Sequence, residues 1–184
     1  MVVMPAKREK DRPMSRHHDA TRPGEIEAPL PERTDARLVF IGRIRTPFAT
    51  RDDCPRRGAP DGPVCRIEIA EAWRPALQGL DRYARAEVLY WMHQARRDLV
   101  LQTPKGGVPI GTFALRSPVR PNPIATSIVD IVGFEEGAVL VRGLDCVDGT
   151  PLLDLKPDRD AFRPLAPERR ADAACVPPPA PADA

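Results

Sequence analysis

The segment 111–124, GTFALRSPVRPNPI, holds the densest group of side chains that could bind a charged ligand. Arg116 and Arg120 are four residues apart, and Asn122 lies between two prolines. Because proline fixes its own backbone angle and restricts the residue before it, the segment is expected to form a stiff loop. A stiff loop loses little entropy when a ligand binds, and a guanidinium pairs well with a carboxylate. The segment suits either a ligand-binding loop or an irregular connection with exposed charges.

A second group of polar side chains lies in the segment 144–156, LDCVDGTPLLDLK. Asp148 and Gly149 predict a tight turn at the end of a strand, and Thr150 adds a hydroxyl group beside it. Asp145 and Asp154 place two more carboxylates near this turn. An Asp-Gly pair between apolar runs is also a common hairpin signal, so the turn alone indicates structure as readily as function.

His93 and Gln94 end an apolar, aromatic run that begins at Ala86. A histidine can exchange protons near neutral pH, although a lone histidine at the edge of a core is more often a hydrogen-bonded structural residue. The four cysteines are far apart in the sequence, with no Cys-X-X-Cys spacing and no nearby pair of histidines. The sequence therefore indicates neither a metal site nor a disulfide framework.

The elements that must position these groups are short and are mostly β-strands. Runs of β-branched and aromatic residues, or of alternating polar and apolar residues, predict these strands, and the run 86–93 is expected to be buried on both faces. A short helix is predicted over residues 71–80, and a hairpin turn over residues 134–137. Without βαβ alternation or a repeat, we expect a mostly β fold, a small barrel or sandwich with one or two short helices. The predicted strands are 37–45, 64–69, 86–93, 99–102, 110–115, 127–132, 138–142 and 152–155.

Two terminal segments differ in composition from the core, residues 38–157. Residues 1–37 contain eight Lys or Arg, seven Asp or Glu and few large apolar residues, so we expect a disordered arm. Residues 158–184 end in VPPPAPADA and are expected to form an extended, Pro/Ala-rich tail. The net charge is +2, which does not by itself favour a nucleic-acid partner. No apolar run reaches the length of a membrane span and no secretory signal is visible, so we expect a cytoplasmic protein that does not contact a membrane.

Taken together and in this order, the motifs resemble those of the TsaA-like, TrmO-type tRNA methyltransferases. The resemblance spans nearly the whole core and rests most on the combination of RSPVRPNPI with a later DGTPLLDLKP. No Gly-X-Gly-X-X-Gly follows a strand, in agreement with a fold of the non-Rossmann kind. The matching segments are IGRIRTPF at 41–48, CPRR at 54–57, WMHQ at 91–94, the loop 111–124 and DGTPLLDLKP at 148–157.

The resemblance implies a small β-barrel that binds S-adenosylmethionine and acts as a homodimer with its sites near the subunit interface. Its implied reaction is methylation of N6 of threonylcarbamoyladenosine at position 37 of tRNA. Arg116 or Arg120 would bind the cofactor carboxylate and Asp148 the ribose, because these groups are chemically matched. His93 or Asp148 would be the catalytic base. The cofactor-binding residues that the resemblance implies are Pro55, Arg56, Arg57, His93, Gln94, Arg116, Arg120, Asn122, Thr126, Asp148, Gly149, Thr150 and Pro151.

Two departures from the family pattern keep other functions open. Family members usually have RPNPIG, whereas this chain has Ala125 and then Thr126 after Ile124, and the usual aromatic and proline pattern after Pro157 is absent. No counterpart of the additional C-terminal domain of the bacterial tRNA-acting members is expected. The alternatives are a methyltransferase acting on another acceptor and a sensor that binds the cofactor without catalysis. The arginines that could form either an RNA-backbone patch or a solvated face are Arg43, Arg45, Arg51, Arg56 and Arg57.

Overall fold

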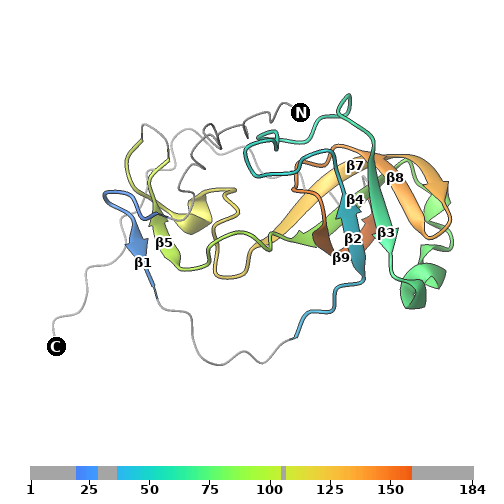
Figure 1. Ribbon diagram of the computed structural model, residues 1–184, viewed down its shortest axis with the longest axis horizontal. Helices are drawn as coiled ribbons and strands as arrows, with labels where there is room; N and C mark the ends of the chain where they lie inside the picture. Colours follow the sequence, from blue (N-terminus) through green and yellow to red (C-terminus); the bar gives the residue numbers. More distant parts are fainter. Residues whose placement is uncertain (1–19, 29–36, 105–106, 159–184) are drawn as a thin grey trace, which may run out of the picture.

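The computed structural model describes residues 20–28, 37–104 and 107–158, and its main feature is a closed antiparallel barrel (Figure 1). The strand order around the barrel is β2-β3-β8-β7-β4-β9, with antiparallel pairing at each junction. The predicted mostly β barrel is therefore confirmed. The strands are β2 (Gly42–Arg45), β3 (Cys65–Ile69), β4 (Arg85–Trp91), β7 (Ile124–Glu135), β8 (Ala138–Arg142) and β9 (Thr150–Pro157).

The interior of the barrel is filled by alternate side chains of these strands. Ile44, Ile67, Val88 and Leu152 are all 0 % exposed and belong to one apolar cluster. The expectation that the run 86–93 is buried on both faces was wrong, because β4 alternates between buried and half-buried residues. A closed barrel buries one face of each strand, so the other face of β4 stays at the surface.

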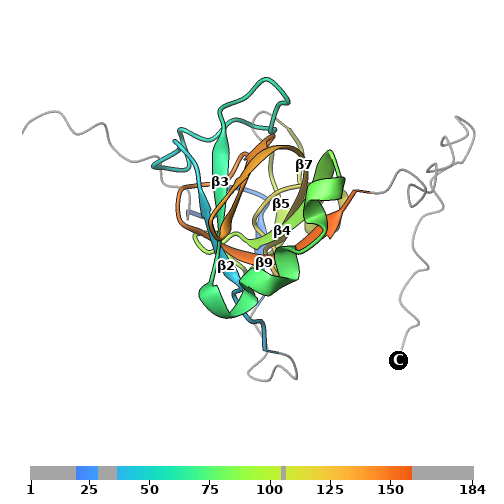
Figure 2. The ribbon, with the colours of Figure 1, turned by 90° about the vertical axis from the view of Figure 1, so that its right-hand side faces the viewer.

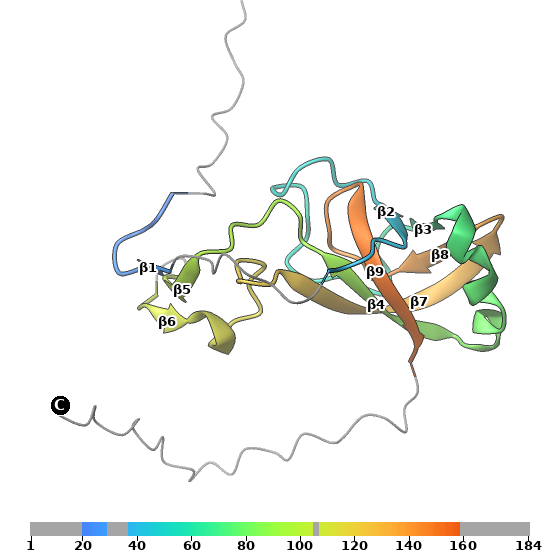
Figure 3. The ribbon, with the colours of Figure 1, turned by 90° about the horizontal axis from the view of Figure 1, so that it is seen from below.

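A small three-stranded sheet lies beside one end of the barrel (Figures 1 and 3). It is formed by β1 (Ile26–Glu27), β5 (Leu99–Gln102) and β6 (Ile110–Gly111). β1 falls within the predicted arm, where pairing to β5 and an ion pair from Arg96 to Glu27 supply contacts that the composition of the arm does not reveal. Residues 1–19 and 29–36 of the arm, and the tail from residue 159, lie outside the described residues.

Several element boundaries differ from the predicted ones. The strand predicted over 110–115 ends at Gly111, and a 3-10 helix, η3 (Thr112–Ala114), follows it. The helix predicted over 71–80 is a 3-10 helix, η1 (Glu71–Leu77), separated from η2 (Leu80–Arg82) by Gly79, whose φ is +86°. Pro75 lies inside η1 and cannot donate a backbone hydrogen bond, which limits a regular α-helix there.

The helices η1 and η2 cover the end of the barrel opposite the small sheet. Figure 2 views the barrel from this end, with η1 and η2 in front of the strands. No helix in the described part of the chain is long and apolar enough to cross a membrane. The end of β4 lies beside the start of β9, since Tyr90 pairs with Leu152, and the sequence motifs adjoin these two strand ends.

Candidate functional site

The Asp148 turn, residues 146–149, is joined to the start of the early loop, residues 46–64, which links β2 to β3. Thr46 donates its backbone N–H to Asp148 Oδ1 at 3.1 Å and its hydroxyl to the Cys146 carbonyl at 2.8 Å. In return, Asp148 donates its backbone N–H to the Phe48 carbonyl at 2.8 Å. Arg45 also contacts the Asp148 carboxylate at 3.5 Å. The turn and the loop therefore form one hydrogen-bonded unit.

The end of β4 lies against the early loop. Arg51 Nη1 donates to the Gln94 carbonyl at 2.8 Å, which fixes the His93-Gln94 pair beside this loop. Met92 donates its backbone N–H to the Pro123 carbonyl at 2.8 Å. His93 and Gln94 are exposed, and their segment connects the early loop with the proline-rich segment before β7.

The Arg116 loop, residues 115–123, uses its two predicted arginines differently. Arg120 donates to the Ser117 carbonyl at 3.0 Å, to the Thr112 carbonyl at 3.3 Å and also to the Leu115 carbonyl. Arg116 is exposed and makes no hydrogen bond or ion pair with any residue that the structure describes. The geometry therefore favours Arg116 for binding an anionic group and gives Arg120 the role of holding the loop together.

Arg97 connects the Arg116 loop to the barrel. Its guanidinium carbon lies 5.3 Å from the centre of the Trp91 ring, a cation–π distance, and its Nε donates to the Pro121 carbonyl at 2.6 Å. Trp91 ends β4 immediately before the His93-Gln94 segment. The stiffness expected from the prolines is thus reinforced by a contact that the sequence pattern did not indicate.

Thr126 and Asn122 are two expected site residues whose side chains do not take part in the hydrogen bonds of this junction. Thr126 is on the outer face of β7, where its hydroxyl donates to Glu87 at 2.8 Å. Asn122 is exposed, and its backbone carbonyl accepts a hydrogen bond from Ile124. The structure therefore brings together the early loop, the His93-Gln94 segment and the Asp148 turn, while Thr126 faces outward.

The arginines of the expected basic patch also divide into two groups. Arg45 pairs with Glu68 at 3.0 Å, and Arg51 holds the Gln94 carbonyl. Arg43, Arg56 and Arg57 are exposed, and within the described ranges none of them makes a hydrogen bond or ion pair. These three guanidinium groups are available for a ligand or for solvent.

Gly58 allows the early loop to contact the barrel directly. A Cβ atom added to Gly58 would lie 1.8 Å from the carbonyl oxygen of Gly143, which itself has a φ of +108°. Contacts this short are not possible for a side chain, so the backbone segments must separate if Gly58 is replaced. The position of Pro55–Arg57 therefore depends on this glycine pair.

The variant Gly58→Ala should lower the free energy of unfolding by about 1–3 kcal/mol, because the added methyl group forces well-packed backbone apart. Urea unfolding followed by tryptophan fluorescence measures this change. Gly111→Ala is the matched control, since a Cβ atom at Gly111 has no neighbour within 4 Å and its φ is −57°. Equal stability of the two variants would contradict the described contact.

A partly buried polar cluster next to these segments is not indicated by the sequence. The Tyr90 hydroxyl lies 2.9 Å from Ser127 Oγ and donates to Asp145 Oδ1 at 2.9 Å. Burial, followed by the nearby Asp145 carboxylate, raises the pKa of Tyr90, so this hydroxyl stays protonated. Tyr90 belongs to an apolar run, and nothing in that run identifies its distant partners.

The cysteines in the described ranges are free thiols. Burial raises the pKa of Cys65 to about 11 and that of Cys146 to about 12, so neither is a reactive thiolate near neutral pH. Within residues 20–28, 37–104 and 107–158, no group of three or more His, Cys, Asp or Glu side chains is placed to hold a metal ion.

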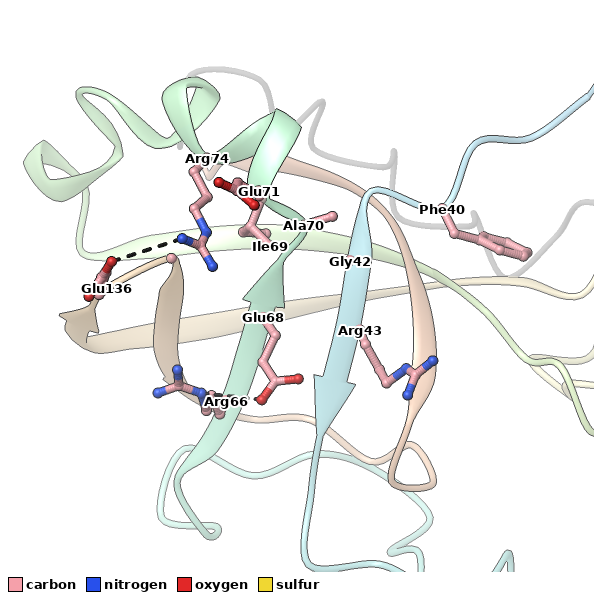
Figure 4. A pocket seen from close by; sticks show the side chains of 11 residues that line it. Phe40, Gly42, Arg43, Arg66, Glu68, Ile69, Ala70, Glu71, Arg74 and Glu136 are labelled. Carbon is pink, nitrogen blue, oxygen red and sulfur yellow. Dashed lines mark ion pairs between the residues drawn. The ribbon is translucent and has the colours of Figure 1, made fainter.

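A surface hollow of about 490 Å³ lies over β2 and β3, outside the barrel (Figure 4). Most of its charges neutralise one another, since Arg66 pairs with Glu68 at 3.5 Å and Arg74 with Glu136 at 4.0 Å. None of the expected cofactor-binding residues lines this hollow. The junction of the motif segments is therefore the better candidate site.

Comparisons with known proteins show the family of this chain. The chain is 51 % identical over 156 residues to the "Probable S-adenosyl-L-methionine-binding protein VirR" of Rhizobium radiobacter. The matched region covers 84 % of this chain and 89 % of that protein. It is 38 % identical over 120 residues to an "S-adenosyl-L-methionine-binding protein" of Archaeoglobus fulgidus, and this match covers 65 % of the chain and 86 % of the relative. The crystal structure of TrmO from P. aeruginosa is similar with a TM-score of 0.61 and 32 % identity, covering 80 % of this chain but only 65 % of that one. Residues 43–162, more than half of the chain, match the tRNA-methyltransferase O N-terminal domain, and the chain belongs to this family.

Proposed function

We propose that this chain transfers a methyl group from S-adenosylmethionine to N6 of threonylcarbamoyladenosine at position 37 of tRNA. The observation that carries the proposal is the hydrogen-bonded junction of the early loop, the His93-Gln94 segment and the Asp148 turn in a barrel of this family. The names of relatives from Rhizobium radiobacter and Archaeoglobus fulgidus support S-adenosylmethionine as the cofactor. The name of the matching family supports tRNA as the acceptor.

Residues of the junction and of the Arg116 loop fit the chemistry of this cofactor. Its carboxylate requires a cationic partner, and the Arg116 guanidinium is exposed without a partner in the described ranges. Its ribose hydroxyls require an acceptor, and the Asp148 carboxylate is exposed at the turn while Thr46 holds its orientation. Gly149 keeps a φ of +78° there, so the turn presents its backbone without a side chain in the way.

The cofactor would supply an electrophilic methyl group, and the role of this chain is to orient the acceptor and to remove a proton. Positioning matters most, since reacting atoms must approach to about 3 Å in line. His93 is exposed at the end of β4, where its imidazole could accept the proton of the acceptor nitrogen. The Asp148 carboxylate already accepts hydrogen bonds from Thr46 and Arg45, which favours His93 as the base.

The test is incubation of the purified chain with labelled S-adenosylmethionine and bulk tRNA from the source strain lacking this gene. Label in methylated threonylcarbamoyladenosine, identified by nucleoside mass spectrometry, would support the proposal. Binding of the cofactor without label in tRNA would indicate another acceptor or a non-catalytic sensor. Absence of cofactor binding would contradict the proposal as a whole.

We further propose that two chains associate through the outer face of β4 and β7. Ile124, Ile128 and Val132 are 43 %, 42 % and 48 % exposed along β7, an unusual apolar row for a free surface. Thr126 lies on this row between Ile124 and Ile128. A second subunit on this face would bring its own site residues near Thr126, which accounts for the outward position of that side chain.

The variant Ile128→Glu should dissociate the dimer, because the new carboxylate would be desolvated in the interface. Analytical ultracentrifugation measures the change as a shift from a dimer to a monomer. Val64→Glu is the control, since Val64 is 46 % exposed next to β3, on the other side of the barrel. A wild-type protein that sediments as a monomer would contradict this assembly.

A further inference from the structure

Ser127, Tyr90 and Asp145 form a chain of hydrogen bonds that ends at a carboxylate. The Tyr90 hydroxyl has one hydrogen atom, which it donates to Asp145 Oδ1, so Ser127 is the donor to Tyr90. Tyr90 is 2 % exposed and cannot move without disturbing the core. One oxygen atom of Asp145 is thus fixed in position by a rigid donor.

Each of these three hydrogen-bonded residues is close in sequence to a segment of the candidate site. Tyr90 is on β4, three residues before His93, and Ser127 follows Thr126 on β7. Asp145 precedes Asp148 by three residues and lies near Cys54, where its charge, after burial, raises the pKa of the thiol. Cys54 is next to Pro55–Arg57 of the early loop. Asp145 therefore lies where the matched segments converge.

Asp145 has no cation to balance its charge in the described part of the chain. It is half-buried, and its hydrogen-bond partner there is the neutral Tyr90 hydroxyl. Its second oxygen, Oδ2, is not buried. A partly desolvated carboxylate without a counter-ion is unfavourable by itself and becomes favourable when a cation binds to it.

We propose that Asp145 binds a positively charged group of S-adenosylmethionine, and this inference rests on the proposed function. The cofactor carries two such groups, the ammonium of its amino acid part and the sulfonium at its centre. In this proposal the contact is made by Asp145 Oδ2, the oxygen that does not accept the Tyr90 hydrogen bond, while Tyr90 and Ser127 act as positioning residues. Asp145 is thereby a determinant of cofactor recognition separate from Arg116 and Asp148, which would bind its anionic and neutral groups.

The test is calorimetric titration of the full chain with S-adenosylmethionine and with S-adenosylhomocysteine, which keeps the ammonium but lacks the sulfonium charge. Asp145→Asn keeps an oxygen that accepts the Tyr90 hydrogen bond and removes the charge. It should weaken binding of S-adenosylmethionine by about 10- to 100-fold, the range for a hydrogen bond to a charged group. An equal loss for both ligands would identify the ammonium as the partner, and a loss confined to S-adenosylmethionine would identify the sulfonium.

Two further variants distinguish the effect of the Asp145 charge from a structural effect of the substitution. Asp145→Glu restores the charge one methylene further from the backbone and should recover part of the lost affinity, which a purely structural role would not produce. Asp81→Asn removes a charge from the exposed helix η2, at the far end of the barrel, and should bind like the wild type. Wild-type affinity in a folded Asp145→Asn protein would overturn this inference alone. Failure of the wild type to bind S-adenosylmethionine would overturn the proposed function and this inference together.

Discussion

Arg116→Ala should raise the Kd for S-adenosylmethionine by about 10- to 100-fold, the effect of losing a hydrogen-bonded ion pair with a carboxylate. Its thermal unfolding should not change, because the Arg116 side chain is exposed and has no partner in the described ranges. Isothermal titration measures the affinity, and differential scanning calorimetry measures the stability. The two results together distinguish a ligand-binding arginine from a structural one.

Arg120→Ala should behave differently, because the Arg120 guanidinium joins the carbonyls of its own loop. Its loss should reduce both stability and affinity. Arg116→Lys should keep part of the binding, since lysine preserves the charge but loses the two-pronged geometry. Arg82→Ala, on the exposed η2, is a control for a lost surface arginine. Unchanged affinity in Arg116→Ala would remove Arg116 from the site and leave Arg56 or Arg57 as carboxylate ligands.

The fold could be predicted where a strand carries a strong local pattern. The alternation of Cys65–Ile69 and the compact apolar run Ala138–Arg142 predicted β3 and β8 to within a residue. The strand predicted over 152–155 is shorter than β9, which includes Pro151 near its start and Pro157 at its end. Pairing with β2 on one side and β4 on the other extends β9 through both prolines. Such extension depends on neighbours that local propensity does not contain.

The segments of the candidate site could be predicted because each one is a contiguous motif in the sequence. The segments around Pro55, His93 and Asp148 do converge, and the hydrogen bonds of Thr46 and Arg51 join them. How each arginine is used could not be predicted, since Arg116 and Arg120 are equivalent in the sequence pattern. The contact between Tyr90 and Asp145 spans 55 residues and arises only when the barrel closes.

Ile44→Ala should lower the free energy of unfolding by about 2–5 kcal/mol, and Ile44→Val by about 0.5–1.5 kcal/mol. Ile44 is 0 % exposed in the centre of β2, opposite Ile67 on β3 and Thr150 on β9. The smaller side chains leave a cavity that the closed barrel cannot collapse around, so the cost should grow with the volume removed. Urea unfolding gives the free energies. The slope of the free energy of unfolding against urea concentration should be unchanged if the transition stays two-state.

The Ile44 series also separates the stability of the barrel from the geometry of the site. The Asp148 turn is attached to β2 through the backbone, where Gly149 donates to the Ile44 carbonyl at 2.8 Å. Because Ile44→Val leaves this carbonyl in place, the folded variant should bind S-adenosylmethionine with the affinity of the wild type. Val64→Ala, at a position 46 % exposed, should change the free energy of unfolding by no more than about 0.5 kcal/mol. If Ile44→Ala lowers the free energy of unfolding no more than Val64→Ala does, Ile44 does not pack in the core. If Ile44→Val loses affinity for S-adenosylmethionine, the turn depends on core packing as well as on its backbone hydrogen bonds.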